Sequence, residues 1–226
     1  MALAIKRPSA TALMLALTFS TGVIDAVGYL GLDKVFTGNM TGNVVILAMA
    51  LTGADGLPIA GPLLALAGFG VGAAAGGRLL RGADAGWNPP TTRVFVGVAG
   101  LLTALAALLA LPGGDVLRLA ITTLLGVAMG AQAAAARHIG VKDVTTVVVT
   151  STVTALFADS RLGNGSGSHW RRRGTAVALI MAGAAVGALL LRVHAGLGVA
   201  LAALVTGVVA WAGHRTLARP ALVVSA

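Results

Sequence analysis

The sequence predicts an all-α membrane protein, a polytopic helical bundle with about six transmembrane helices and two short re-entrant or broken half-helices. Composition supports this fold class: 57% of the 226 residues are hydrophobic, 10% are charged, and the mean hydropathy is +0.93. Soluble domains carry about 25% charged residues. The apolar runs also lack the alternation of a membrane β-barrel. Because lipid offers the backbone no hydrogen-bond partners, helices remain as the way to cross the bilayer. The lipid bilayer is therefore the first binding partner that the sequence predicts.

The charged residues limit the function further. The formal net charge is +9, but Lys and Arg lie at the ends of apolar runs, a pattern of membrane topology rather than of nucleic-acid binding. Cysteine is absent from the sequence, which excludes disulfides, thiol catalysis and thiolate metal sites. No set of His and Asp has metal-ligand spacing, and no nucleophile–base pair lies in an apolar run. We therefore expect no enzyme activity, no cofactor and no metal.

Eight apolar segments follow one another, in the order long, short, long, long within each half. They cover residues 9–32, 39–52, 58–80, 93–111, 116–136, 144–157, 175–191 and 195–211. The turn at Pro112-Gly113-Gly114 separates the two sets, which predicts a single membrane domain made of repeat halves 1–112 and 113–226. In the polar loop between the third and fourth segments, Pro89-Pro90 argue against a helix, and Trp87 is expected to anchor the chain at the membrane interface.

The second segment of each half is too short to cross a bilayer. As helices, 44–51 would extend about 12 Å and 144–157 about 21 Å, whereas the hydrocarbon core is roughly 30 Å thick. If all eight segments crossed, the 16 Lys and Arg would divide nine to seven between the two sides. If the short segments re-enter, thirteen lie on one side and only Lys34, Arg118 and Arg192 on the other. The positive-inside rule favours this second arrangement, which makes the halves an inverted repeat with both termini cytoplasmic.

Glycines recur at four-residue spacing in the third and seventh segments. They are Gly68, Gly72 and Gly76, then Gly183 and Gly187. Small residues at this spacing form a face that a neighbouring helix can approach closely. The spacing leaves open whether the faces pack within one protomer or between two, so a homo-oligomer remains an alternative.

Asp25 is the first candidate functional residue, because it lies inside the first apolar segment. An ionised Asp at the centre of a membrane helix costs roughly 2.5–3.5 kcal/mol on insertion scales. One interpretation is a proton or cation coupling site. The other is a structural acid that accepts hydrogen bonds from the start of the following half-helix or from nearby Thr and Asn. The second half places a neutral polar residue, Gln132, at the corresponding position.

The run Thr37-Gly38-Asn39-Met40-Thr41-Gly42-Asn43 is the second candidate. Its glycines allow an unwound backbone, and its Thr and Asn side chains can cap the helix that follows. N–H groups at such a start suit an anion or a carbonyl, although capping alone would explain the composition. The predicted substrate- or ion-binding set comprises Asp25, Thr37, Asn39, Thr41 and Asn43 from the first half and Gln132, Thr146, Thr150 and Thr152 from the second.

Two stretches carry a resemblance to a known family. Thr21-Gly22-x-x-Asp25-Ala26 with Val35-Phe36-x-x-Asn39-Met40-Thr41-Gly42-Asn43 resembles the first half of the YoaK-like family of bacterial integral membrane proteins, a domain of unknown function. Gly130-x-Gln132-x-Ala134 and Asp143-x-Thr145-Thr146-x-x-x-Thr150 resemble its second half, with a departure at Ala133-Ala134, where Asn-Ala is expected. The resemblance implies an inner-membrane protein of about six helices and supplies no substrate.

These observations lead to one functional expectation and one alternative. The first is a small multi-pass permease or channel-like protein of the bacterial inner membrane, which moves an unidentified small solute and is coupled to protons or cations through Asp25. The alternative is a non-transporting membrane protein that binds a partner subunit or a lipid. The alternative predicts that the polar residues around Asp25 satisfy one another internally.

Overall fold

The computed structural model describes residues 8–141, 149–160, 163, 165 and 169–218, and all of the secondary structure in these residues is helical. The helices are α1 (Ala10–Gly31), α2 (Met40–Leu51), α3 (Ala60–Leu79), α4 (Pro89–Leu108), α5 (Asp115–Ile139), α6 (Val149–Ala158), α7 (Trp170–Leu191) and α8 (Ala195–Leu217). In the described residues, six helices are long and apolar enough to cross a membrane, and α2 and α6 are the two shorter ones. The predicted fold class is confirmed.

Local capping explains where several helices begin. The Ser9 Oγ accepts from Ala12 N at 3.2 Å at the start of α1, and the Asn88 side chain accepts from Thr91 N at 2.9 Å at the start of α4. Such caps satisfy N–H groups that have no partner inside the helix. The expectation that Pro89-Pro90 prevent a helix is wrong, because α4 begins at Pro89 itself. In the first turn a proline removes no intrahelical hydrogen bond.

Trp87 does not anchor at an interface as predicted, because it is buried at 7% exposure. Its ring stacks on Phe95, with 5.3 Å between the ring centroids. Its Nε1 donates to the Thr92 Oγ1 at 3.0 Å. The indole also covers Gly213 of α8, where a Cβ would overlap the ring. Trp87 therefore joins the start of α4 to the end of α8.

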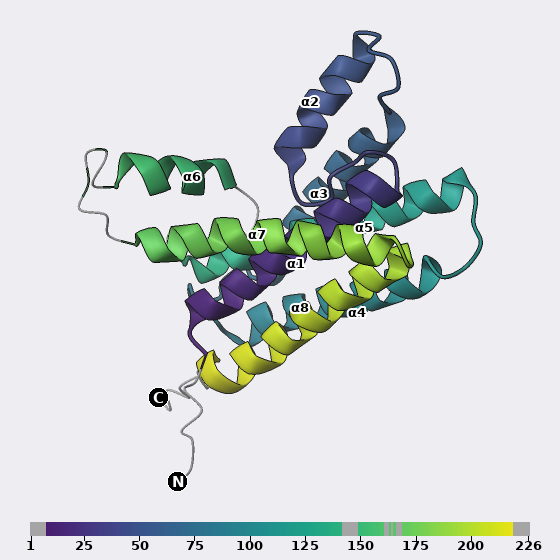
Figure 1. The fold of residues 1–226 in the computed structure, drawn as a ribbon. Coiled ribbons are helices and arrows are strands. Elements are labelled where there is room, and N and C mark those ends of the chain that lie inside the picture. Colours follow the sequence, from purple (N-terminus) through teal and green to yellow (C-terminus); the bar gives the residue numbers. More distant parts are fainter. Residues whose placement is uncertain (1–7, 142–148, 161–162, 164, 166–168, 219–226) are drawn as a thin grey trace.

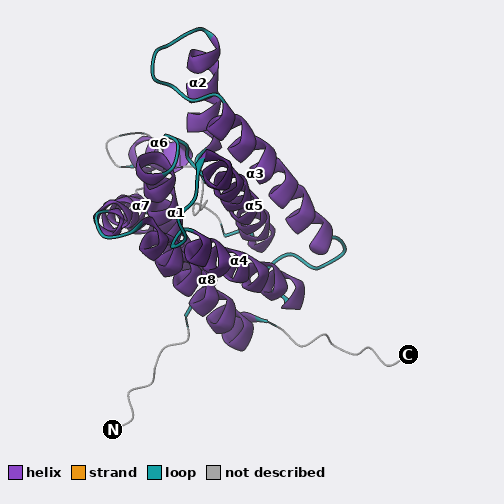
Figure 2. Ribbon diagram, turned by 90° about the vertical axis from the view of Figure 1, so that its right-hand side faces the viewer, coloured by secondary structure: helices purple, strands orange, loops and turns teal. Residues whose placement is uncertain are grey.

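The glycine faces pack within the protomer, which resolves the alternative left open by the sequence. A Cβ on Gly72 of α3 would overlap the Val127 carbonyl of α5, and one on Gly130 of α5 would overlap the Phe69 carbonyl of α3. The pair formed by α1 and α7 repeats this contact, with Gly22 against Ile180. Figure 2 shows both pairs side by side in the bundle. Close backbone approach of this kind is the usual basis of helix association in lipid.

Contacts between helices fix their relative directions. α1 and α7 are parallel, because Gly22 lies beside Ile180 and Gly31 beside Leu191. α3 and α5 are parallel by the same criterion, with Gly68 beside Thr123 and Gly76 beside Ala131.

The remaining long pairs are antiparallel. The start of α4 lies at the end of α8, where Trp87 meets Gly213, and Ala106 near the end of α4 meets Gly196 at the start of α8. The Ser20 Oγ of α1 donates to Ala202 O of α8 at 3.4 Å, while Val27, further along α1, lies against Gly198, earlier in α8. α4 and α5 are joined by the short turn 109–114 and pack together.

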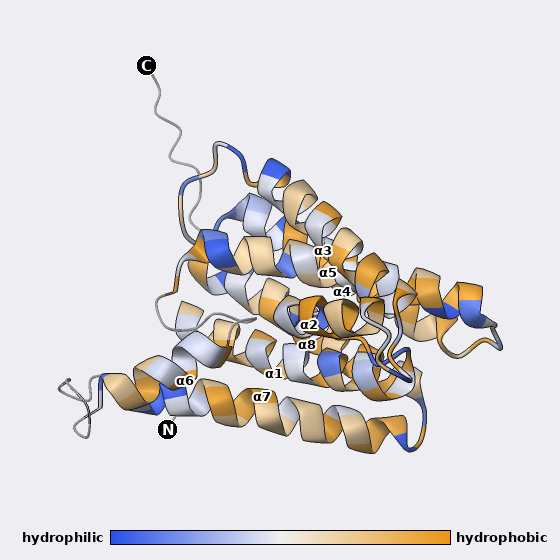
Figure 3. Ribbon diagram, turned by 90° about the horizontal axis from the view of Figure 1, so that it is seen from above, coloured by the Kyte–Doolittle hydropathy of each residue, from blue (hydrophilic) through white to orange (hydrophobic). Residues whose placement is uncertain are grey.

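Together these relations give the six long helices alternating directions in chain order. The alternation places the end of α1 and the start of α3 on the same side of the bundle, and likewise the end of α5 and the start of α7, which is consistent with the predicted re-entry of the two short segments. At α2 this is directly visible, because the Lys34 Nζ before the helix donates to Gly56 O after it at 2.8 Å. In Figure 1, α2 projects from the bundle and α6 lies along α7. Figure 3 shows hydrophobic residues along most of the length of α7.

The helix contacts are the same in the two halves. If each of α1–α4 is relabelled as its counterpart among α5–α8, and the reverse, the same pairs of helices are in contact. The pair α1–α7 corresponds to α5–α3, the pair α1–α8 to α5–α4, and the pair α2–α3 to α6–α7. The pairs α4–α8 and α1–α5 map onto themselves. The core, formed mainly by α1, α4, α5 and α8, lies between the two halves.

The topology predicts the labelling of single cysteines in this cysteine-free chain. Lys34→Cys and Asp55→Cys, before and after α2, should react with a membrane-impermeant maleimide from the same side of the membrane. Asp84→Cys, beyond α3, should react only from the other side and serves as the control for sidedness. All three positions are exposed. Labelling of Lys34→Cys and Asp55→Cys from opposite sides would mean that α2 crosses.

The glycine packing predicts a position-specific loss of stability. Gly72→Leu should lower the thermal unfolding temperature in detergent, because its side chain meets the backbone of Val127 and overpacking costs about 1–3 kcal/mol. Gly70→Leu on the same helix is the matched control, since a Cβ there has no neighbour within 4 Å. Equal unfolding temperatures for the two variants would contradict the packing.

Candidate functional site

The connection between α1 and α2 folds back onto α1 at the level of Asp25. Val35 O lies 2.6 Å from the place where Gly28 would carry a Cβ. At Gly38 a Cβ would lie 2.8 Å from the Thr21 Cγ2 and 3.4 Å from the Asp25 Oδ1. The glycines of the sequence motif therefore allow backbone to pack on helix where a larger residue would not fit. This contact places the start of α2 beside Asp25.

Asp25 binds the backbone that leads into α2. Its Oδ1 accepts from Thr37 N at 2.9 Å and from Gly38 N at 2.7 Å. Charge-assisted hydrogen bonds of this length are among the strong ones, and the N-terminus of α2 favours a negative charge nearby. The Asn39 backbone and the Thr37 side chain also interact with the carboxylate. This is the arrangement that the structural interpretation of Asp25 describes.

Asn39 and Asn43 hold the same connection in place. The Asn39 Oδ1 caps α2 by accepting from Gly42 N at 3.3 Å. The fully buried Asn43 side chain accepts from Phe36 N at 2.8 Å and donates to Phe36 O at 2.5 Å. One side chain thus satisfies both polar backbone groups of a residue outside any helix. The two asparagines satisfy backbone groups that the bilayer could not.

Gln132 of α5 reaches α1 one turn before Asp25. Its Nε2 lies 3.4 Å from the Thr21 Oγ1, which itself donates to Leu17 O at 3.0 Å. Because the threonine proton is already used, Thr21 can only accept from Gln132, and this fixes the amide orientation. In the described part of the chain, the Gln132 Oε1 is buried without a hydrogen-bond partner, whereas the Thr37 side chain interacts with the Asp25 carboxylate. A buried polar atom left in this state costs about 1–3 kcal/mol.

The structure brings together only part of the predicted set. Asp25, Thr37, Asn39 and Asn43 meet at the start of α2, and Gln132 contacts the same stretch of α1. Thr41 lies in α2 but is exposed. Of the second-half threonines, Thr150 and Thr152 do not join this group, and Thr146 lies outside the described residues.

Thr150 and Thr152 belong to α6, which contacts α7 alone within the described ranges. Thr150 is exposed and Thr152 is buried. Arg173 of α7 holds the end of α6, with its Nη1 2.7 Å from Ala155 O and 2.8 Å from the Asp159 Oδ2. In the second half, the described part of the corresponding region is a contact between α6 and α7. The position that corresponds to Asp25 carries the neutral residue Gln132.

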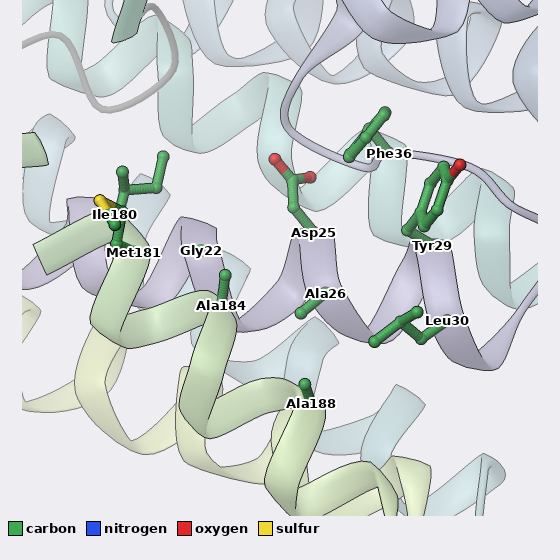
Figure 4. A pocket seen from close by; sticks show the side chains of 10 residues that line it. All are labelled: Gly22, Asp25, Ala26, Tyr29, Leu30, Phe36, Ile180, Met181, Ala184 and Ala188. Carbon is green, nitrogen blue, oxygen red and sulfur yellow. The ribbon is translucent and has the colours of Figure 1, made fainter.

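A groove runs beside Asp25, between α1 and α7 (Figure 4). Its volume is about 390 Å³, and its lining is almost entirely apolar. Of the ten lining residues only Asp25 carries a charge. They are Gly22, Asp25, Ala26, Tyr29, Leu30, Phe36, Ile180, Met181, Ala184 and Ala188. The described residues contain no cluster of three or more His, Asp or Glu side chains that could hold a metal ion.

Sequence reasoning missed two members of this site. Thr21 lies one turn before Asp25, so its i, i+4 spacing was a usable signal for a shared face. Phe36 carried no signal of its own, since its role rests on its backbone groups and on a ring stacked against Tyr29, with 4.9 Å between the centroids.

Comparisons with known proteins identify the family of this chain. Residues 13–212 match the family model described as a protein of unknown function, DUF1275. The chain is 29% identical over 147 residues to the UPF0700 transmembrane protein YoaK of Bacillus subtilis (strain 168). That alignment covers 65% of this chain and 65% of YoaK, slightly less than two thirds of the relative. No solved structure matches the chain. The chain therefore belongs to the DUF1275 family, as the sequence motifs indicated, and it is a multi-pass membrane protein.

Proposed function

We propose that this protein is a small permease of the bacterial inner membrane in which Asp25 binds the transported ion or the proton coupled to transport. The observation that carries the proposal is the position of Asp25, an ionisable side chain inside a membrane-spanning helix and in direct contact with the start of a helix that does not cross. Sites of this composition are typical of transporters, where half-helix ends meet near the middle of the bilayer.

The helix directions support an inverted repeat as the framework of this permease. In chain order, α1, α3 and α4 run opposite to their counterparts α5, α7 and α8, while the helix contacts are preserved under exchange of the halves. Two inverted halves can rock against each other and expose a central site to either side in turn. The positive-inside rule supports a cytoplasmic location for the basic ends and for both termini.

The buried oxygens near Asp25 also support a binding role. The Gln132 Oε1 is a buried acceptor without a donor in the described structure, and the Thr37 side-chain oxygen lies beside the Asp25 carboxylate. Buried acceptors are usually hydrogen-bonded in native structures. A proton, a cation or a water that enters this region would be stabilised by them.

Purified protein in liposomes tests the proposal. Vesicles loaded with a pH-sensitive dye and energised by a potassium gradient with valinomycin should acidify faster with the wild-type chain than without protein. Asp25→Asn should reduce this rate to that of empty vesicles, because the amide cannot exchange a proton, although its oxygen still accepts from Thr37 N and Gly38 N. Asp55→Asn, in the exposed turn after α2, is the matched control and should retain the wild-type rate.

The same measurements cover sodium and potassium flux across pH. If Asp25→Asn leaves every flux unchanged, the permease proposal fails. The second candidate, a non-transporting protein that binds a lipid or a partner subunit, is favoured by the internal hydrogen bonds of Asn39, Asn43 and the Asp25 Oδ1. It predicts no flux above that of empty vesicles for wild type at any pH.

A further inference from the structure

The groove beside Asp25 opens on the outer surface of the bundle. It lies between α1 and α7, both of which are long enough to cross the membrane. Two of its lining residues, Leu30 and Met181, are 59% and 67% exposed. In a membrane-spanning bundle this outer surface faces lipid, so an occupant would enter from the bilayer rather than from a water-filled channel.

The shape of the groove follows from the packing of α1 on α7. Small residues form its floor, with Gly22 and Ala26 on α1 and Ala184 and Ala188 on α7, and Figure 4 shows both alanines of α7 on the side that faces α1. A volume of about 390 Å³ falls within the range of small-molecule sites. The groove is therefore large enough for an organic molecule and much larger than a bare ion requires.

Charge and polarity narrow the chemistry of the occupant. A neutral apolar molecule would cover the Asp25 carboxylate without giving it a partner, which is unfavourable away from water. An inorganic cation would pair with the carboxylate and leave the apolar walls unfilled. A molecule with an apolar body and one positive charge satisfies both parts of the lining, since Asp25 is the one charged residue among apolar ones.

The aromatic pair at one end of the groove favours the same chemistry. Tyr29 and Phe36 both line it, and their rings stack with an interplanar angle of 23°. Aromatic faces attract organic cations, most strongly where water is excluded. The Phe36 ring is held in position because Asn43 binds both backbone groups of that residue.

We propose that the groove between α1 and α7 binds a lipophilic organic cation from the bilayer, with the positive charge next to Asp25 and the apolar body between the two helices. This inference rests on the proposed function and names the substrate class of the same site. It also gives the apolar wall of the groove a role, namely to bind the apolar body of the ligand. Coupling of a proton or an inorganic cation through Asp25 would not require such a wall.

Binding of tetraphenylphosphonium to the full chain in nanodiscs of neutral lipid tests the proposal. Tetraphenylborate has the same shape and the opposite charge, and it is the matched control ligand. Calorimetric titration, corrected with empty nanodiscs, should give saturable binding of the cation and no saturable binding of the anion. Asp25→Asn should weaken cation binding by about tenfold or more, because it removes the one negative charge from an apolar lining where charge attraction is poorly screened.

A second pair of variants tests the groove wall independently of Asp25. Ala188→Phe should abolish cation binding by filling the groove. Ala185→Phe on the same helix is exposed and does not line the groove, so it should bind as wild type does. Size-exclusion profiles identify any variant that fails to fold, and the wall variants keep the test decisive if Asp25→Asn does so.

Three results would overturn the proposal. Equal binding of cation and anion, or equal binding by wild type and both Asp25→Asn and Ala188→Phe, would indicate partition onto apolar surface. An Asp25-dependent flux of protons or inorganic cations without tetraphenylphosphonium binding would overturn the inference and leave the permease proposal intact. Conversely, cation binding that depends on Asp25 and Ala188 without any flux would support the groove and overturn the permease.

Discussion

The structure depends on how unpaired backbone groups are satisfied where the chain leaves α1 and starts α2. Lipid cannot hydrogen-bond to these groups, so side chains must do so. Asp25 binds the N–H groups of Thr37 and Gly38, and Asn43 binds both polar groups of Phe36. Without these bonds the connection could not lie against α1, and α2 would lose the support that lets it start beside a spanning helix and return to the side it came from.

The glycine contacts supply the second constraint. Within lipid, helices gain little from burying apolar surface, so close backbone contact decides which helices pair. The two glycine-rich pairs, α1 with α7 and α3 with α5, each join a helix of one half to a helix of the other. The halves therefore cannot separate as independent units. The same close approach of α1 to α7 leaves the small-residue groove beside Asp25, so packing and the candidate binding site share residues such as Gly22.

The structural contact of Asp25 and its proposed binding role need not exclude each other. The carboxylate accepts from the backbone at the start of α2 and also lines an apolar groove. Any ligand that changes the charge of the carboxylate also changes the strength of its bonds to Thr37 and Gly38, because hydrogen bonds to a charged acceptor are stronger. Binding at the groove is thus physically linked to the position of α2. This linkage is a direct way for a bound ion or proton to influence the conformation of a half-helix.

The sequence by itself determined the membrane class, the six long and two short helices, the acid inside α1 and the capping residues, because hydropathy, length and helix-start chemistry are local properties. It failed at Pro89, where a rule has a positional exception and the proline starts α4, and at Trp87, which packs on Gly213 of α8. Tertiary structure alone decided that the glycine faces pair within one protomer, that Asn43 binds Phe36 and that Thr150 and Thr152 lie on a helix which packs against α7. These contacts join segments that are far apart in the chain, and the composition of one segment does not indicate which other segment it contacts.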